Sequence, residues 1–270
     1  MLALDPESDP ARTRLCELAL REHRWADALA LADGLVARHE PGSHDWDRIV
    51  AATALGRWDI VRAAAARLGI DIEQSDAPID EHWGTIRLRT SSQQQFWATR
   101  TGPVTARIES ITGDRTDRER QDDVVLFDPA PVDREESGER TITTYRELHV
   151  LHEGRRRAFT IDAVHPGDEA LRTLVDDLDT FDLRLQKRSG DGYALTPPDA
   201  DDSVPGVYLS ASVDEDADLE ALHRQLLAAV ESWPGAAVWL ELCQALVVER
   251  GSAYADELER QQSVAERHGM

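Results

Sequence analysis

The sequence predicts an α+β fold in which N-terminal antiparallel helical hairpins pack on a mainly antiparallel sheet domain with two helices and a C-terminal helical pair. Three observations predict it. A pattern in residues 24–35 recurs 33 positions later, a period typical of paired helices. From Trp83 the spacing of apolar residues changes from helical to alternating, which indicates half-buried strands. Helical spacing returns after Pro234-Gly235.

The first 70 residues contain four segments with helical spacing of apolar residues. We expect helices over residues 11–22, 25–40, 43–53 and 57–68. The pair Arg24-Trp25 recurs as Arg57-Trp58, and an alanine-rich helical face follows each copy. Because the connections are short, consecutive helices would form antiparallel hairpins, with Gly56 ending the third helix.

The two copies resemble tetratricopeptide-type repeats over residues 10–70. That family places a small residue and a turn before an aromatic position, followed three residues later by alanine, which matches residues 23–28. In residues 56–61 a valine replaces the alanine, and Cys16 and Ile49 stand where the family has an early glycine. A generic antiparallel helical array is the alternative interpretation.

The resemblance implies a concave groove for an extended peptide, lined by the first helix of each hairpin. By position, the candidate groove residues are Glu17, Arg21, Trp46 and Val50, with Thr13, Leu20 and Thr53 beside them. Two hairpins bury only part of their apolar faces, so we expect the rest of the chain to cover them. The acidic stretch 71–80 would separate a helical region, residues 1–72, from an α+β domain, residues 80–270.

Alternation of apolar and polar residues predicts strands between residues 83 and 164. We expect strands over residues 85–89, 96–100, 104–108 and 124–127, the last ending at Asp128-Pro129. Residues 112–122 and 133–140 are charged and are predicted to be surface loops. Residues 145–152 and 158–164 flank Glu153-Gly154-Arg155, which predicts a β-hairpin.

Residues 156–232 show the order strand, helix, strand, strand, helix. That order is most of a ferredoxin-like split unit, although other two-layer α+β sheets also have it. For residues 236–248, the spacing of Trp239, Leu242, Cys243 and Leu246 favours a helix over a closing strand. We therefore expect C-terminal helices over residues 236–268.

Composition restricts the class of partner. The chain of 270 residues has 52 acidic and 30 basic residues, a net charge of −22, and a surface this negative disfavours direct binding to nucleic acid. Only Lys187 among the basic residues is a lysine, so the acidity is also consistent with a salt-rich habitat or a GC-rich genome. Two cysteines, Cys16 and Cys243, exclude a disulfide framework and a zinc site built on several thiolates.

No apolar run approaches the roughly 20 residues that a membrane helix needs. The first five residues lack the basic start and apolar core of a signal peptide. We therefore expect a cytoplasmic protein that does not act at a membrane.

Known catalytic and metal motifs are absent from the sequence. His149 and His152, with Asp162 and His165 on the strand expected beside them, come nearest to a metal site, but residues three apart on a strand point to opposite faces. The glycines of residues 189–192 lack a Walker lysine, and the aspartates of 199–202 lack a calcium-loop pattern. We expect no catalytic residues, no metal and no cofactor.

Arginines form the more informative pattern. Arg87, Arg89 and Arg107 would share the non-core face of adjacent strands, and Arg100 would extend that strip. A basic strip on an acidic protein is a candidate anion-binding site for a carboxylate or a phosphate. The alternative is that these arginines form internal salt bridges.

The repeat and the lack of catalytic motifs together indicate an adaptor that binds another protein through a helical-repeat platform. One alternative is an acidic inhibitor or immunity-type protein that blocks a basic nucleic-acid-binding or nuclease partner. Another is an enzyme with an unfamiliar site in the α+β domain. An open groove would favour the adaptor, and an affinity that falls with added salt would favour the inhibitor. A deep pocket of convergent polar groups would favour the enzyme.

Overall fold

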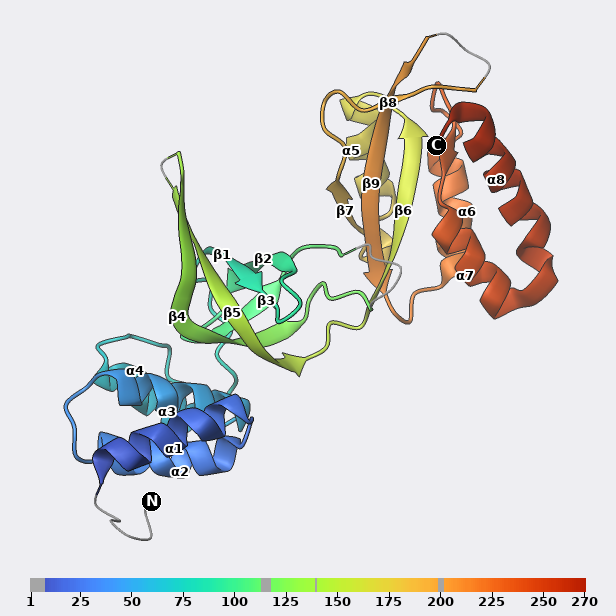
Figure 1. Ribbon diagram of the computed structural model, residues 1–270. Coiled ribbons are helices and arrows are strands. Elements are labelled where there is room, and N and C mark those ends of the chain that lie inside the picture. The colour runs from blue at the N-terminus through green and yellow to red at the C-terminus, as the bar shows by residue number, and fades with distance from the viewer. Residues whose placement is uncertain (1–7, 113–117, 139, 199–201) are drawn as a thin grey trace. The chain divides into compact units, whose positions relative to one another are not determined.

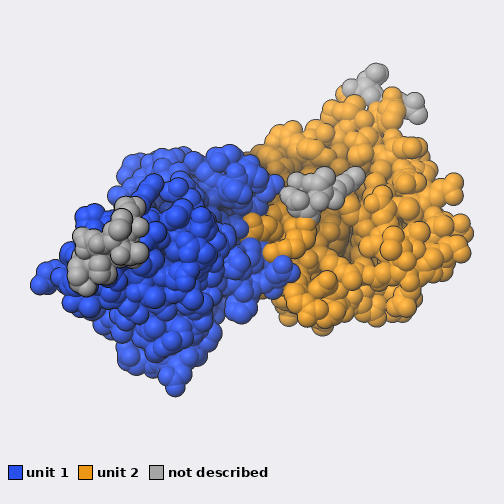
Figure 2. All heavy atoms as spheres, turned by 60° about the horizontal axis from the view of Figure 1, so that its bottom comes forward, with its two compact units in different colours: residues 1–109, 122–153 blue, residues 110–121, 154–270 orange. Residues whose placement is uncertain are grey.

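The computed structural model describes residues 8–112, 118–138, 140–198 and 202–270. The chain divides into two compact units, coloured separately in Figure 2: unit 1 comprises residues 1–109 and 122–153, and unit 2 comprises residues 110–121 and 154–270. The α+β class predicted from the sequence is confirmed, because helices accompany two mainly antiparallel sheets. The two compact units do not separate at residues 72–80, where the sequence placed the domain boundary. The first sheet belongs to the same unit as the helices and shares a core with them.

Unit 1 opens with two helical hairpins. They consist of α1 (Asp9–Arg21), α2 (Trp25–Val36), α3 (Ser43–Ala54) and α4 (Trp58–Arg67). The turn inside each hairpin is the same: Arg24 and Arg57 each donate a backbone N–H, at 2.8 Å, to the carbonyl five residues earlier. Each follows a residue with positive φ, His23 or Gly56. The backbone therefore repeats where the sequence does.

Strands β1 to β5 form a closed barrel in the same unit (Figure 1). They are β1 (Thr85–Arg89), β2 (Gln95–Arg100), β3 (Thr105–Ile108), β4 (Val124–Ser137) and β5 (Arg140–His152). Consecutive strands pair antiparallel, whereas β1 and β5 pair parallel. An odd number of strands in up-and-down order must close this way, because the first and last run in the same direction. Leu88, Phe96 and Phe127 lie in the barrel core.

The predicted loop over residues 133–140 is wrong. Strand β4 continues past Asp128 and Pro131 to Ser137, and β5 returns from Arg140, so the two form a ribbon that extends beyond the barrel (Figure 1). The ribbon has solvent on both faces, so it lacks the apolar alternation that indicates a half-buried strand. Register shifts on either side of Pro131 accommodate a residue that has no N–H to donate.

The barrel covers the helices, as the sequence predicted for the remainder of the chain. Val104 and Leu126, from the barrel, are fully buried in one cluster with Cys16 and Val50 of the helices. Neighbours of Leu126 along β4 point into the barrel instead, because successive residues of a strand face opposite sides. Strand β4 therefore contributes to two cores at once, one on each face.

Unit 2 contains the second sheet. Its elements are β6 (Arg156–Val164), α5 (Asp168–Asp177), β7 (Arg184–Lys187), β8 (Ala194–Leu195), β9 (Val204–Asp214), α6 (Leu219–Val230), β10 (Ala237–Val238), α7 (Leu240–Arg250) and α8 (Ala255–His268). The antiparallel order β10-β6-β9-β7 is that of a ferredoxin-like split unit. The predicted hairpin between residues 145–152 and 158–164 is wrong, because β5 and β6 belong to different sheets.

The C-terminal part of unit 2 differs from the prediction at its start. A two-residue strand, β10, precedes the helix that was predicted over residues 236–248. Beyond β10, the carboxylate of Glu241 accepts hydrogen bonds from the backbone N–H and the hydroxyl of Thr160, at 3.3 and 2.6 Å. A side chain therefore satisfies the edge of β6 where a longer strand would otherwise pair.

The connection between β3 and β4 belongs to unit 2, although both strands belong to unit 1. Gln121 accepts a hydrogen bond from the Ser212 hydroxyl of β9, and the Ile111 carbonyl accepts one from Arg188. The central part of this predicted loop, residues 113–117, and residues 199–201 lie outside the described residues. In the ranges that the structure describes, no helix has the length and apolarity needed to cross a membrane.

Candidate functional site

The predicted peptide groove is occupied by the barrel. Val50 is only 3% exposed and, with the half-buried Trp46, packs in the cluster that contains Leu126 of β4. Glu17 and Arg21 remain at the surface, where Glu17 forms an ion pair with Arg14 at 2.7 Å. The groove that the resemblance implies is therefore covered at Trp46 and Val50, because the two hairpins need a cover for their apolar surface.

Charged residues lie where β4 of the barrel covers α3. Burial raises the pKa of Asp47 on α3, and the negative charges of Glu17 and Asp128 raise it further, while His44 opposes the shift. Asp128 lies on β4, the strand that contacts α3, the first helix of the second hairpin.

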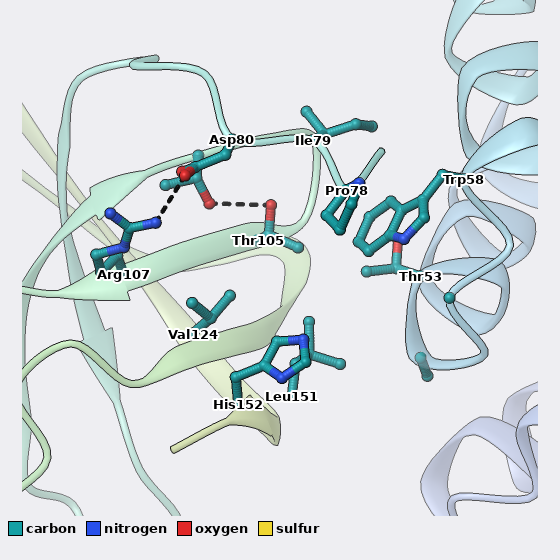
Figure 3. Close-up of a pocket in the computed structure, with 13 residues that line it drawn as sticks. Thr53, Trp58, Pro78, Ile79, Asp80, Thr105, Arg107, Val124, Leu151 and His152 are labelled. Atoms are coloured by element: carbon teal, nitrogen blue, oxygen red, sulfur yellow. Dashed lines mark hydrogen bonds and ion pairs between the residues drawn. The ribbon is translucent and has the colours of Figure 1, made fainter. Parts of the chain in front are cut away.

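A cavity of about 520 Å³ remains between the helices and the barrel of unit 1 (Figure 3). Its walls come from the α3–α4 turn, the linker before β1, and strands β3 to β5. The lining residues are Thr53, Ala54, Gly56, Trp58, Pro78, Ile79, Asp80, Thr101, Thr105, Arg107, Val124, Leu151 and His152. Most of the wall is apolar, and its size is that of a small-ligand pocket.

The linker is fixed as one wall of the cavity. Arg62 of α4 is 7% exposed and donates hydrogen bonds to the carbonyls of Glu73 and Ala77, at 2.8 and 3.0 Å. Ile79 is 5% exposed and lies so close to Gly102 that a β-carbon there would come within 3.1 Å of it. Buried anchors on both sides thus hold the chain across the gap between helices and barrel.

Four polar side chains of the cavity are paired with each other, whereas the buried hydroxyl of Thr53, which also lines it, has no hydrogen-bond partner among the described residues. Arg107 donates to the carboxylate of Asp80 at 2.7 Å, and the hydroxyls of Thr101 and Thr105 are 3.2 Å apart (Figure 3). The charges of Arg107 and Asp80 cancel, so the lining favours a neutral group over an anion or a cation.

The arginine strip lies on the outer face of the barrel. Arg87 stacks over Trp97, with the guanidinium carbon 4.8 Å from the ring centroid, and pairs with Glu135 of the ribbon at 3.1 Å. Arg107 faces the cavity and pairs with Asp80. Arg100 does not extend the strip as predicted. It alternates in β2 with the same phase as the core residues Phe96 and Ala98, so its side chain points into the barrel.

Arg100 lies among aromatic rings on the inner side of the barrel. Its guanidinium carbon is 5.1 Å from the ring centroid of Trp83 and 5.5 Å from that of Phe127, and its nitrogens donate to the carbonyls of Gly102 and Pro103. Burial lowers the pKa of Arg100. These contacts give Arg100 a structural role at the turn before β3.

The histidines considered for a metal site are not brought together with their predicted partners. His149 packs against the rings of His23 and Trp25, and His152 lines the cavity. Asp162 belongs to the sheet of unit 2, where it accepts hydrogen bonds from the Tyr193 hydroxyl at 2.9 and 3.0 Å. The expectation that β5 and β6 are neighbours is the error that grouped these residues.

A different cluster, in unit 2, has the composition of a metal site. Ligand atoms of His223, Cys243 and Glu257 all lie within 4.8 Å of one another, although the residues are far apart in the sequence. The indole N–H of Trp239 donates to Nδ1 of His223 at 2.9 Å, so the proton of the neutral imidazole is on Nε2. A metal ion needs the lone pair of one ring nitrogen, but that of Nδ1 accepts from Trp239 and Nε2 carries the proton. The hydrogen bond therefore favours a structural role.

His223 should make the stability of unit 2 depend on pH. Burial lowers the pKa of His223 below its ordinary 6.5, while Glu257 raises it and Arg260 lowers it further. The unfolded chain therefore binds the proton first as pH falls, so stability is complete above pH 6.5 and declines below it. We expect the unfolding temperature of unit 2 to drop between pH 7.5 and 5.5 by less in His223→Gln, which keeps an acceptor for Trp239 but does not titrate. Equal drops in both proteins would contradict this role.

Comparison with protein-family models and with curated proteins found no match. Among solved structures, the chain is similar to a hypothetical protein from Neisseria gonorrhoeae. The identity is 12%, the match covers 58% of this chain and 94% of that chain, and the TM-score is 0.26. A likeness of this degree supports no conclusion about function.

Proposed function

We propose that the protein is a non-catalytic adaptor that binds another protein, and that the cavity of unit 1 accepts a neutral, apolar side chain of that partner. The observation that carries the proposal is a cavity of about 520 Å³ with a mainly apolar wall. Its two charged residues, Arg107 and Asp80, form an ion pair with each other. A pocket of this kind takes an anchoring side chain and excludes water around it. The tetratricopeptide-like hairpins then serve as one wall of the site.

Leu55 offers a position from which to test the cavity. It is 42% exposed and lies between the lining residues Ala54 and Gly56. A photo-crosslinking amino acid at position 55 should capture a defined partner from the source organism's lysate at its own salt level. The change Ala54→Trp, which fills the cavity, should abolish that crosslink.

The matched control is Ala26→Trp, at an exposed position on α2 away from the cavity. It should leave the crosslink unchanged, since it adds the same side chain without occupying the site. The proposal is contradicted if Ala54→Trp folds normally, as judged by circular dichroism, and still gives the same crosslinked product as the control.

An acidic inhibitor is the second candidate function, because the exposed ribbon carries Asp133, Glu135 and Glu136 on a chain of net charge −22. Such a surface would bind a basic partner mainly through long-range attraction. The two candidates differ in their response to salt. Anchoring in a neutral cavity is nearly insensitive to added salt, whereas an affinity that collapses with salt and survives Ala54→Trp would favour the inhibitor.

A further inference from the structure

Two arginines stand side by side on the outer face of the barrel. Closure of the barrel pairs β1 with β5 in parallel, and in that register Arg89 lies beside Arg146. The preceding pair, Leu88 and Tyr145, belongs to the barrel core, so the two arginines point outward. Neighbouring strands are about 4.8 Å apart, which is close enough for both guanidinium groups to reach one ligand.

These two arginines have no carboxylate partner, unlike their neighbour Arg87, which pairs with Glu135. In the described part of the protein, neither Arg89 nor Arg146 forms a hydrogen bond or an ion pair with a carboxylate, although acidic residues outnumber basic ones 52 to 30. Nε of Arg89 is also buried and has no hydrogen-bond acceptor. A buried donor without an acceptor is destabilising, and two adjacent cations repel each other.

The neighbours of the pair complete a small recognition surface. Arg87, two residues before Arg89 on the same face, stacks on Trp97 and is neutralised by Glu135. Trp97 is 38% exposed, so it presents part of an aromatic ring beside the arginines. The net positive charge of this face is therefore concentrated at Arg89 and Arg146, with an apolar flank.

We propose that Arg89 and Arg146 form a binding site for a compact oxyanion of a partner protein, either a phosphate monoester or two adjacent carboxylates. Arginine forks match both groups, and the oxyanion would supply the acceptor that Nε of Arg89 lacks. A long nucleic-acid backbone fits less well, because it needs a track of several cations and would meet an acidic protein beyond this pair. The site is separate from the cavity and does not depend on it.

Three fluorescein-labelled heptapeptides of glycine and serine test the site: one with a central phosphoserine, one with two adjacent glutamates, and one unmodified. The phosphoserine or the diglutamate peptide should bind in fluorescence anisotropy, and the unmodified one should not. Binding should also shift the side-chain Nε–H resonance of Arg89 in NMR spectra. Either Arg89→Gln or Arg146→Gln should weaken binding about tenfold or more, as expected for a lost charge-assisted contact.

The control is Arg14→Gln, which removes the same charge from an exposed arginine on α1. It should change the affinity less than about twofold, because its charge is screened at that distance. The proposal is overturned if neither anionic peptide binds below about 10 mM, or if the Arg89 and Arg146 variants bind as tightly as the control. Binding of the phosphoserine peptide alone would identify a phosphate site, and binding of the diglutamate peptide would identify an acidic segment.

Discussion

Replacing Trp239 by alanine is expected to destabilise unit 2 by about 3–5 kcal/mol, the cost typical of removing a large aromatic side chain from a core. Trp239 is fully buried in the main cluster of that unit. Its backbone N–H donates to Gln261 at 3.0 Å and its indole N–H to His223 at 2.9 Å. The residue therefore joins α6, α7 and α8, and amides of α7 and β6 should lose protection from hydrogen exchange.

A second variant separates packing from hydrogen bonding. Trp239→Phe keeps most of the apolar volume but leaves Nδ1 of His223 without a donor, so we expect a smaller loss of about 1–3 kcal/mol. Urea unfolding followed by hydrogen exchange measures both variants on unit 2 alone. If Trp239→Ala costs no more than Trp239→Phe, the indole ring does not hold the three helices together and this account of the core is wrong.

Trp239 also shows what periodicity predicts and what it misses. The helical spacing that follows it indicates α7 correctly. The two residues before it pair with β6, and a strand of that length is too short for any alternation to be recognised. The pairing of β10 depends on β6, which comes from a distant part of the chain. Helices were predicted closely, whereas strand partners were not.

Turn signals have the same limit. Glu153-Gly154-Arg155 separates two strands as predicted, but those strands belong to different sheets. A turn sequence describes local backbone and contains no information about what pairs on either side. The grouping of His149 with Asp162 depended on that pairing and therefore was wrong too. Long-range contacts, which decide strand neighbours, also created the cavity and the Arg89–Arg146 pair.

The sequence predicted which arginines face outward from the barrel, but not which residues lie beside them. Alternation placed Arg87, Arg89 and Arg107 on the outer face of the barrel, and the register places them there. Alternation could not show that Arg107 forms an ion pair with Asp80. It also could not show that Arg146 of β5 is the register partner of Arg89. The cavity itself was not predicted, although Thr53, Arg107 and His152 were considered for other sites, since its lining comes from the helices, the linker and the barrel.

Replacing Leu126 by alanine tests whether the helical hairpins depend on the barrel. Leu126 is fully buried, lies on the outer face of β4, and belongs to the core of the helices. We expect a loss of about 2–5 kcal/mol in the free energy of unfolding of unit 1, as for other buried leucines. Because two hairpins cannot bury their apolar faces alone, amides of α3 should lose as much protection from hydrogen exchange as those of β4.

Leu18→Ala is the matched control, because Leu18 is 39% exposed on α1 and its truncation opens no buried space. We expect it to change stability by about 0.5 kcal/mol or less. If α3 keeps its protection in Leu126→Ala while β4 loses it, the hairpins are stable without the barrel. They would then behave as an independent repeat module, and the groove that β4 covers would become accessible whenever the barrel opens. Equal losses in α3 and β4 would instead make the helices and barrel one cooperative unit, and the cavity between them a permanent feature of the surface.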